Sequence, residues 1–83
     1  MKIKIKPKKY YKNYYTILKS SYNIVYTGNK WVYDIASKIK NEPLSKWTKK
    51  MKWVTIEHWQ KRINMYNYNV KEISKEDVFL ELL

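Results

Sequence analysis

The stretch KWTKKMKWVTIEHWQKRI, residues 46–63, decides the fold that this sequence predicts. Its three tryptophans, Trp47, Trp53 and Trp59, recur every six residues, with lysines between them. Six residues of a helix turn through about 240°, so one continuous helix would point the three rings in three directions. A surface helix buries a single apolar stripe, so the stretch predicts a break near residues 52–54.

Two helices joined by a tight turn remove this conflict. The first helix would follow NEP (residues 41–43), because proline suits a first turn. The second would begin with Thr55 as its N-cap and carry Glu57 in its first turn, where a negative charge is favoured. NMYNYN (64–69) would end it. A strand over residues 51–58 is the alternative, although neither of its faces is consistently apolar.

Residues 30–40 allow two interpretations, of which a helix capped by Asn29 is favoured. In the alternative, Gly28 and Asn29 form a type II′ hairpin turn and Tyr26 faces Trp31, which makes one shared strand face wholly apolar. The helix is favoured because apolar residues continue at helical spacing beyond the length of a short strand. They are Val32, Ile35, Ala36 and Ile39.

The N-terminal third predicts an arm and a hairpin. KIKIK (residues 2–6) alternates strictly, which indicates one apolar and one basic face, and the following proline ends this strand or places it at an edge. PKKYYKNYY (7–15) has no clear period and is interpreted as a basic, aromatic arm. YTILK (15–19) and YNIVYT (22–27) are rich in aromatic and β-branched residues, so they predict a hairpin with its turn at residues 20–21.

SKEDVFLELL (residues 74–83) predicts a C-terminal helix with Ser74 as N-cap and Asp77 at the reciprocal capping position. We therefore expect an α+β, helix-dominated fold in a single small domain of residues 1–83. It would consist of a basic arm or edge strand (1–15), a body (16–70) and an acidic, apolar C-terminal helix (71–83). The body would contain the hairpin and a three-helix bundle.

The segments WVYDIASKIK, PLSKWTKKM and VTIEHWQKRINMY, within residues 31–66, resemble the helix-turn-helix arrangement of many DNA-binding proteins. The resemblance implies that the helix starting at Thr55 lies in the major groove. Gln60 and Asn64 would then read adenine edges. Four lysines would contact phosphates: Lys46, Lys49, Lys50 and Lys52.

The charge is strongly positive and unevenly distributed. The chain carries 18 Lys and Arg against 7 Asp and Glu, for a net charge of +11. Residues 1–33 contain eight lysines and no acid, whereas residues 71–83 have a net charge of −2. This asymmetry indicates a polyanionic partner. A/T-rich coding is a competing explanation, because Lys, Asn, Tyr and Ile make up 42 of the 83 residues. It does not explain why acids avoid the first 33 residues.

The sequence argues against an enzyme and against a cofactor or metal. It has no cysteine, one histidine (His58) and one glycine (Gly28), so it lacks the usual metal ligands and a glycine-rich phosphate loop. Glu76 and Asp77 are adjacent and diverge on a helix, which suits capping rather than acid–base catalysis. No stretch approaches the roughly 18 apolar residues of a membrane span, and the apolar run of a signal peptide is missing. We expect an intracellular protein, in a host cytoplasm or an organelle matrix.

These observations predict a small nucleic-acid-binding protein that uses lysine–phosphate contacts with aromatic support. DNA and RNA, and monomer and homodimer, remain open. One alternative is a small viral or mobile-element factor that docks on a host enzyme, and another is a structural subunit of a large assembly such as an organellar ribonucleoprotein. The expected nucleic-acid-binding residues are Lys2, Lys4, Lys6, Lys8, Lys9, Lys12, Lys46, Lys49, Lys50, Lys52, Gln60, Lys61, Arg62 and Asn64.

Overall fold

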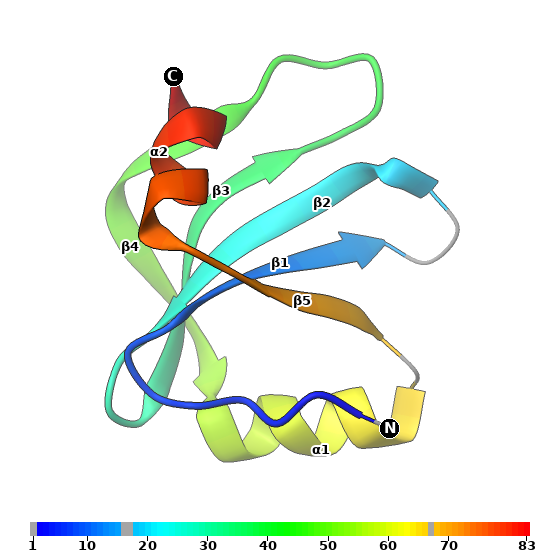
Figure 1. Cartoon of the computed structure of the whole chain (residues 1–83), viewed down its shortest axis with the longest axis vertical. Helices are drawn as coiled ribbons and strands as arrows, with labels where there is room; N and C mark the ends of the chain where they lie inside the picture. Colours follow the sequence, from blue (N-terminus) through cyan, green and yellow to red (C-terminus); the bar gives the residue numbers. More distant parts are fainter. Residues whose placement is uncertain (1, 16–17, 67) are drawn as a thin grey trace.

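A five-stranded antiparallel sheet with two short helices forms the fold (Figure 1). The computed structural model describes residues 2–15, 18–66 and 68–83. Along the chain the elements are β1 (Tyr10–Tyr15), β2 (Leu18–Thr27), β3 (Trp31–Lys38), β4 (Ser45–Thr55), α1 (Ile56–Tyr66), β5 (Asn69–Ile73) and α2 (Lys75–Leu82). The expected three-helix bundle is therefore wrong: two of its three helices, at residues 30–40 and 43–51, are the strands β3 and β4.

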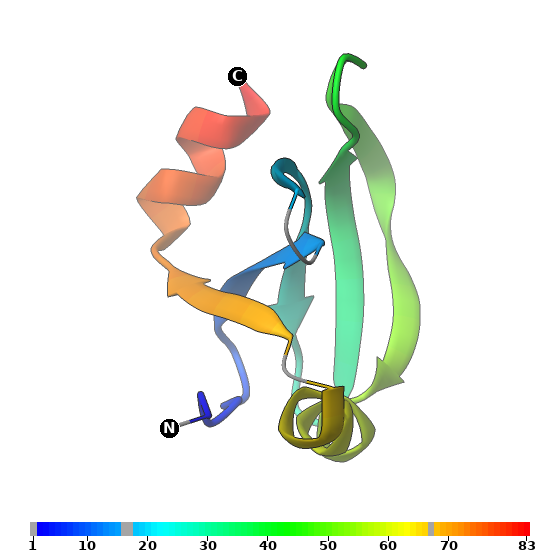
Figure 2. The ribbon, with the colours of Figure 1, turned by 90° about the vertical axis from the view of Figure 1, so that its right-hand side faces the viewer.

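The order of the strands across the sheet is β4-β3-β2-β1-β5. Strands β1 to β4 form a meander, and α1 then carries the chain from β4 at one edge to β5 at the other (Figures 1 and 2). Strand β1 pairs with both β2 and β5, so Tyr10–Tyr15 lies inside the sheet. The interpretation of residues 7–15 as an arm is wrong for this part.

Local irregularities explain why β3 and β4 look helical in the sequence. Asp34 pairs with Met51 and Ala36 with Lys46, so the register shifts around Ile35. As a result Val32 belongs to the core cluster, whereas Ala36 is equally buried but lies outside it. Two buried residues four positions apart imitate the spacing of a helical stripe, although only Val32 packs in the core cluster.

The hairpin alternative for residues 22–38 is correct, but its details differ. Tyr26 pairs with Tyr33 instead of Trp31, and the Gly28 N–H donates to the Trp31 carbonyl oxygen at 2.8 Å. The φ of Gly28 is not positive, which excludes a type II′ turn with this residue at its first central position. A Cβ at Gly28 would lie 3.1 Å from Cε2 of Tyr33, so the glycine makes room for this ring.

The first hairpin also differs from the expectation. Ser20 and Ser21 lie within β2 and do not form its turn. Ser21 is buried, and its hydroxyl oxygen accepts a hydrogen bond from the backbone N–H of Lys40, which ties β2 to the segment after β3. The connection between β1 and β2 falls at residues 16–17, outside the described residues.

The core lies between one face of the sheet and α1. Trp59 and Ile63 of α1 are fully buried there, together with residues of the sheet and Ile5. The rings of Trp53 and Trp59 meet edge to face with their centroids 5.8 Å apart, whereas Trp47 is only half-buried on β4. The three tryptophans are thus divided between a strand and a helix. The sheet residues of the core cluster are Tyr11, Val25 and Val32.

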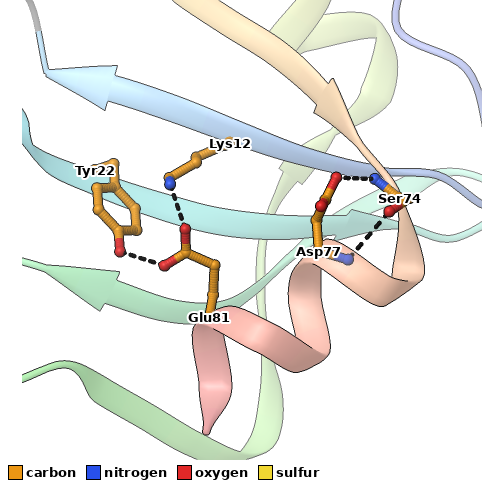
Figure 3. Close-up of polar contacts among 5 residues, drawn as sticks. All are labelled: Lys12, Tyr22, Ser74, Asp77 and Glu81. Carbon is orange, nitrogen blue, oxygen red and sulfur yellow. Dashed lines mark hydrogen bonds and ion pairs between the residues drawn. The ribbon is translucent and has the colours of Figure 1, made fainter.

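The predicted caps are correct. The Thr55 hydroxyl oxygen accepts a hydrogen bond from the backbone N–H of His58 at the start of α1. Ser74 and Asp77 form a reciprocal capping box at the start of α2 (Figure 3). Among the described residues, no helix is long and apolar enough to cross a membrane.

The alternation in residues 2–6 is also correct, although this segment forms no strand. Ile5 is buried in the core cluster and Ile3 packs against it, while Lys4 and Lys6 are exposed. Gln60 of α1 hydrogen-bonds to the backbone of this segment. The segment therefore lies fixed against α1, with its basic side chains directed to solvent.

Candidate nucleic-acid interface

The face of the sheet opposite the core cluster carries aromatic rings and lysines side by side. Directly paired residues of neighbouring strands lie on the same face, so the register places Tyr10, Tyr26, Tyr33 and Lys52 in one row across β1 to β4. Trp31 lies two residues from Tyr33 on β3 and shares this face. We use the name lysine–aromatic face for six side chains: Tyr10, Tyr26, Trp31, Tyr33, Lys50 and Lys52.

Two lysines of β4 lie directly over rings of this face. The Nζ of Lys52 is 3.6 Å from the ring centroid of Trp31, and the Nζ of Lys50 is 4.1 Å from that of Tyr26. Each contact of this kind contributes about 0.5–1 kcal/mol at an exposed site. Both lysines are exposed, so their ammonium groups are held in place and still accessible to a ligand.

The rings also support one another. Tyr10 and Tyr26 are cross-strand partners, with their ring centroids 4.7 Å apart. Tyr26 therefore contacts Tyr10 and also lies under Lys50. Because the Tyr26 ring is held by its neighbour, the lysine above it loses less conformational entropy when it binds a ligand.

At the other end of the same face, α2 contributes Glu81 (Figure 3). One carboxylate oxygen of Glu81 lies 2.5 Å from Nζ of Lys12, and the other accepts a hydrogen bond of 2.6 Å from the hydroxyl of Tyr22. Burial alone would raise the pKa of the Glu81 carboxyl, but the hydrogen bonds from Lys12 and Tyr22 outweigh it and lower this pKa. Burial and, next, the hydrogen bond to Glu81 raise the pKa of Tyr22 to about 12.

Two of the predicted lysines are bound by α2. Lys12 pairs with Glu81, and Nζ of Lys46 donates a hydrogen bond to the carbonyl oxygen of Leu82 at the end of α2. Only Lys50 and Lys52 of the predicted set belong to the lysine–aromatic face. Lys49 is exposed on β4 next to them.

The predicted residues of α1 are placed differently. The Gln60 amide hydrogen-bonds to the N-terminal segment and to the Asn64 side-chain oxygen. It therefore stabilises the fold, and its polar atoms are already engaged within the protein. Lys61 is exposed and lies 3.9 Å from Glu57, an ion pair too exposed to add appreciable stability. Arg62 is half-buried.

A separate groove lies beside the N-terminal segment, and Lys4 is the lysine of that segment that lines it. The groove has a volume of 460 Å³ and lies between residues 4–7, the β2–β3 loop and the start of α1. Its apolar side chains include Ile5 and Ile56, and its lysines are Lys4, Lys30 and Lys61. The remaining predicted lysines of this segment are exposed: Lys2, Lys6, Lys8 and Lys9.

The rings of the lysine–aromatic face are absent from the predicted set. The hairpin alternative could have indicated these rings, because it already placed Tyr26 and Trp31 on one face. Which lysine lies over which ring depends on the pairing of β3 with β4, and the sequence indicated a helix for both of these segments.

No protein-family model, curated protein or solved structure matches this chain. The function proposed below therefore rests on the side chains, their geometry and their charge.

Proposed function

We propose that the protein binds nucleic acid through its lysine–aromatic face and has no catalytic activity. The observation that supports this most directly is the pair of exposed lysines, Lys50 and Lys52, held over the rings of Tyr26 and Trp31. Ordered ammonium groups neutralise backbone phosphates and release counterions. The net charge of +11 adds long-range attraction for the same ligand.

The shape of this face favours a single strand over a duplex. Its side chains extend across four strands, from β1 to β4, which corresponds to about 14 Å. The major groove of B-DNA is only about 12 Å wide and accepts a helix or a two-stranded ribbon. Unpaired bases can instead reach the tyrosine rings beside the lysines, and such stacking tolerates any base.

The composition of the face also predicts low sequence specificity. Both of its cations are lysines, which act as point charges, whereas arginine makes bidentate contacts to base edges. Affinity should therefore depend strongly on salt and weakly on sequence.

The test is fluorescence anisotropy with labelled single-stranded and duplex oligonucleotides of one sequence, at two salt concentrations. The single strand should bind more tightly, and added salt should weaken its binding. The variant Lys50→Gln/Lys52→Gln should lower the slope of log affinity against log salt by about 1.4, at about 0.7 per phosphate contact. Lys40→Gln/Lys75→Gln removes the same charge elsewhere and should leave most of this slope in place. Weak binding at low salt, or equal slopes for both variants, would contradict the proposal.

A second candidate function is protein binding, and the exposed apolar side chains at α2 favour it. Phe79, Leu80 and Leu83 are 61 %, 69 % and 95 % exposed, which is unusual for neighbouring large apolar residues. Affinity capture after nuclease treatment separates the two functions. A single protein retained by the wild type and lost in Phe79→Ser/Leu80→Ser supports this second function, and loss of all partners on nuclease treatment contradicts it.

A further inference from the structure

Glu81 places a carboxylate where Lys12 and Tyr22 converge on the sheet (Figure 3). Its two oxygens are bound separately, one by the ammonium group and the other by the phenol hydroxyl. A phosphodiester also offers two oxygens that share one negative charge. The side chains of Lys12 and Glu81 are 14 % and 30 % exposed, so the pair is shielded but still within reach of solvent.

We propose that Lys12 and Tyr22 form a second phosphate site, which Glu81 occupies in this structure and a nucleic-acid phosphate takes when α2 moves aside. This inference rests on the proposed function, because the ligand is the same single-stranded nucleic acid. The exchange replaces one anion by another and leaves Lys12 neutralised in both states. It therefore avoids the large cost of leaving a shielded charge unpaired.

The site does not depend on Glu81 for its shape. Nζ of Lys12 lies 4.0 Å from the ring centroid of Tyr22 and 5.4 Å from that of Tyr14, and these two rings are 5.9 Å apart. The ammonium group is thus held by tyrosines of β1 and β2, inside the sheet. It would keep its position after α2 leaves.

The second site continues the lysine–aromatic face. The register places Lys12, Ile24, Ala36 and Lys46 in a row across β1 to β4, next to the row that runs from Tyr10 to Lys52. Glu81 binds the lysine at one end of this row, and the Leu82 carbonyl oxygen binds the lysine at the other. Displacement of α2 would free Lys12 and Lys46, and a nucleic-acid strand already bound to the neighbouring row would then lie beside them.

Few contacts hold α2 in place. Val78 is the one buried side chain of α2, whereas Phe79 and Leu80 are mostly exposed. The capping box joins Ser74 to Asp77 and stabilises the helix itself, without attaching it to the sheet. A groove of 520 Å³, lined by Lys12, Lys71 and Leu80 among others, separates α2 from β1 and β5. A phosphate can approach Lys12 through this groove.

Two variants of equal charge test the inference. Glu81→Gln removes the carboxylate from the site, and Glu76→Gln removes one from the exposed first turn of the same helix. Glu81→Gln should bind a single-stranded oligonucleotide at least fivefold more tightly than Glu76→Gln, since coupling of this kind starts at about fivefold. In the background Lys12→Gln the difference should disappear, because the phosphate site is lost.

Hydrogen exchange of the α2 amides gives a readout that does not depend on affinity. A bound oligonucleotide should accelerate exchange in α2 of the wild type. Equal affinities of Glu81→Gln and Glu76→Gln, with α2 exchange unchanged on binding, would overturn the second site and leave the proposed function intact. If no variant binds at low salt, the proposed function and this inference both fall. Circular dichroism checks that each variant is folded.

Discussion

The side chain of Gln60 binds the backbone around Ile5 as a neighbouring strand would. Its Oε1 accepts a hydrogen bond of 2.6 Å from the Ile5 N–H, and its Nε2 donates one of 2.9 Å to the Ile3 carbonyl oxygen. One amide thus supplies the acceptor and the donor that a strand would offer to two alternate peptide groups. This explains how residues 2–6 stay extended without joining the sheet.

Removal of this amide should release the N-terminal segment. Gln60→Ala removes both hydrogen bonds, at about 1 kcal/mol each, so the free energy of unfolding should fall by about 2 kcal/mol in urea titrations. Hydrogen exchange at the Ile5 amide should accelerate. Asn64→Ala removes only the third partner of the Gln60 amide and is the control. Equal losses in the two variants would contradict the role given to Gln60.

Thr27 holds the turn before β1. Its fully buried hydroxyl accepts a hydrogen bond from the Lys9 N–H at 2.9 Å and donates one to the Lys6 carbonyl oxygen at 2.6 Å. Thr27→Val keeps the shape and leaves these backbone groups without partners, so the free energy of unfolding should fall by about 2 kcal/mol. Thr48→Val, on the exposed side of β4, should change it by less than about 0.5 kcal/mol. A neutral Thr27→Val variant would contradict this account.

The ring under Lys50 should matter for binding even though it carries no charge. Tyr26→Leu leaves the net charge at +11 but removes the surface over which Lys50 is ordered. A loss of about 0.5–1 kcal/mol corresponds to a two- to fivefold weaker affinity for a single strand in anisotropy measurements. Tyr66→Leu changes an exposed tyrosine of α1 and serves as the control. If the two variants bind alike, charge alone explains the binding.

Acid should loosen α2. The folded-state pKa of Glu81 is lowered, so its contribution to stability is complete above the unfolded-state pKa and is lost as the pH falls through the folded-state value. The protection factors of the α2 amides, that is, their exchange rates relative to an unfolded chain at the same pH, should therefore fall below about pH 4, the usual range of a glutamate. In Glu81→Gln this acid-dependent change should be clearly smaller, and what remains comes from the Asp77 carboxylate of the capping box. An unchanged pH profile in that variant would contradict the assignment.

Alkali should act on the same contact through Tyr22. Its folded-state pKa is raised to about 12, so it favours the folded state fully below its ordinary value of 10.0, and this contribution is lost as the pH rises towards 12. The unfolding free energy of the wild type should fall across this window more steeply than that of Tyr22→Phe. Chemical denaturation at several pH values between 9 and 12 measures the difference. Parallel curves would show that the Tyr22 hydroxyl contributes nothing.

Local signals predicted the helix starts correctly. Thr55 caps α1, and Ser74 and Asp77 form their box, because these contacts span only three residues. Residues 2–6 alternate as expected for a similar reason: a single neighbouring helix buries one side of them. These features needed no knowledge of which strands pair.

Strands β3 and β4 were predicted as helices because bulges disturb the two-residue period. Val54 pairs with Val32 and Lys52 with Tyr33, so Trp53 is skipped in the register. Trp53 and Val54 therefore both pack against the core cluster, and neither face of the segment looks consistently apolar. In the candidate site, the composition predicts the lysines. Which aromatic rings lie beside them depends on the pairing of β3 with β4.

The pairing of β1 with β5 sets the order in which the protein can fold. Tyr10 pairs with Ile73, so the strand next to the middle of the sheet gains its second neighbour from a part of the chain that is made much later. Contacts so distant in sequence slow folding, because a long loop must close first. During synthesis, β1 to β4 can form a meander before β5 is made. The backbone groups on the other edge of β1 stay unpaired until β5 arrives.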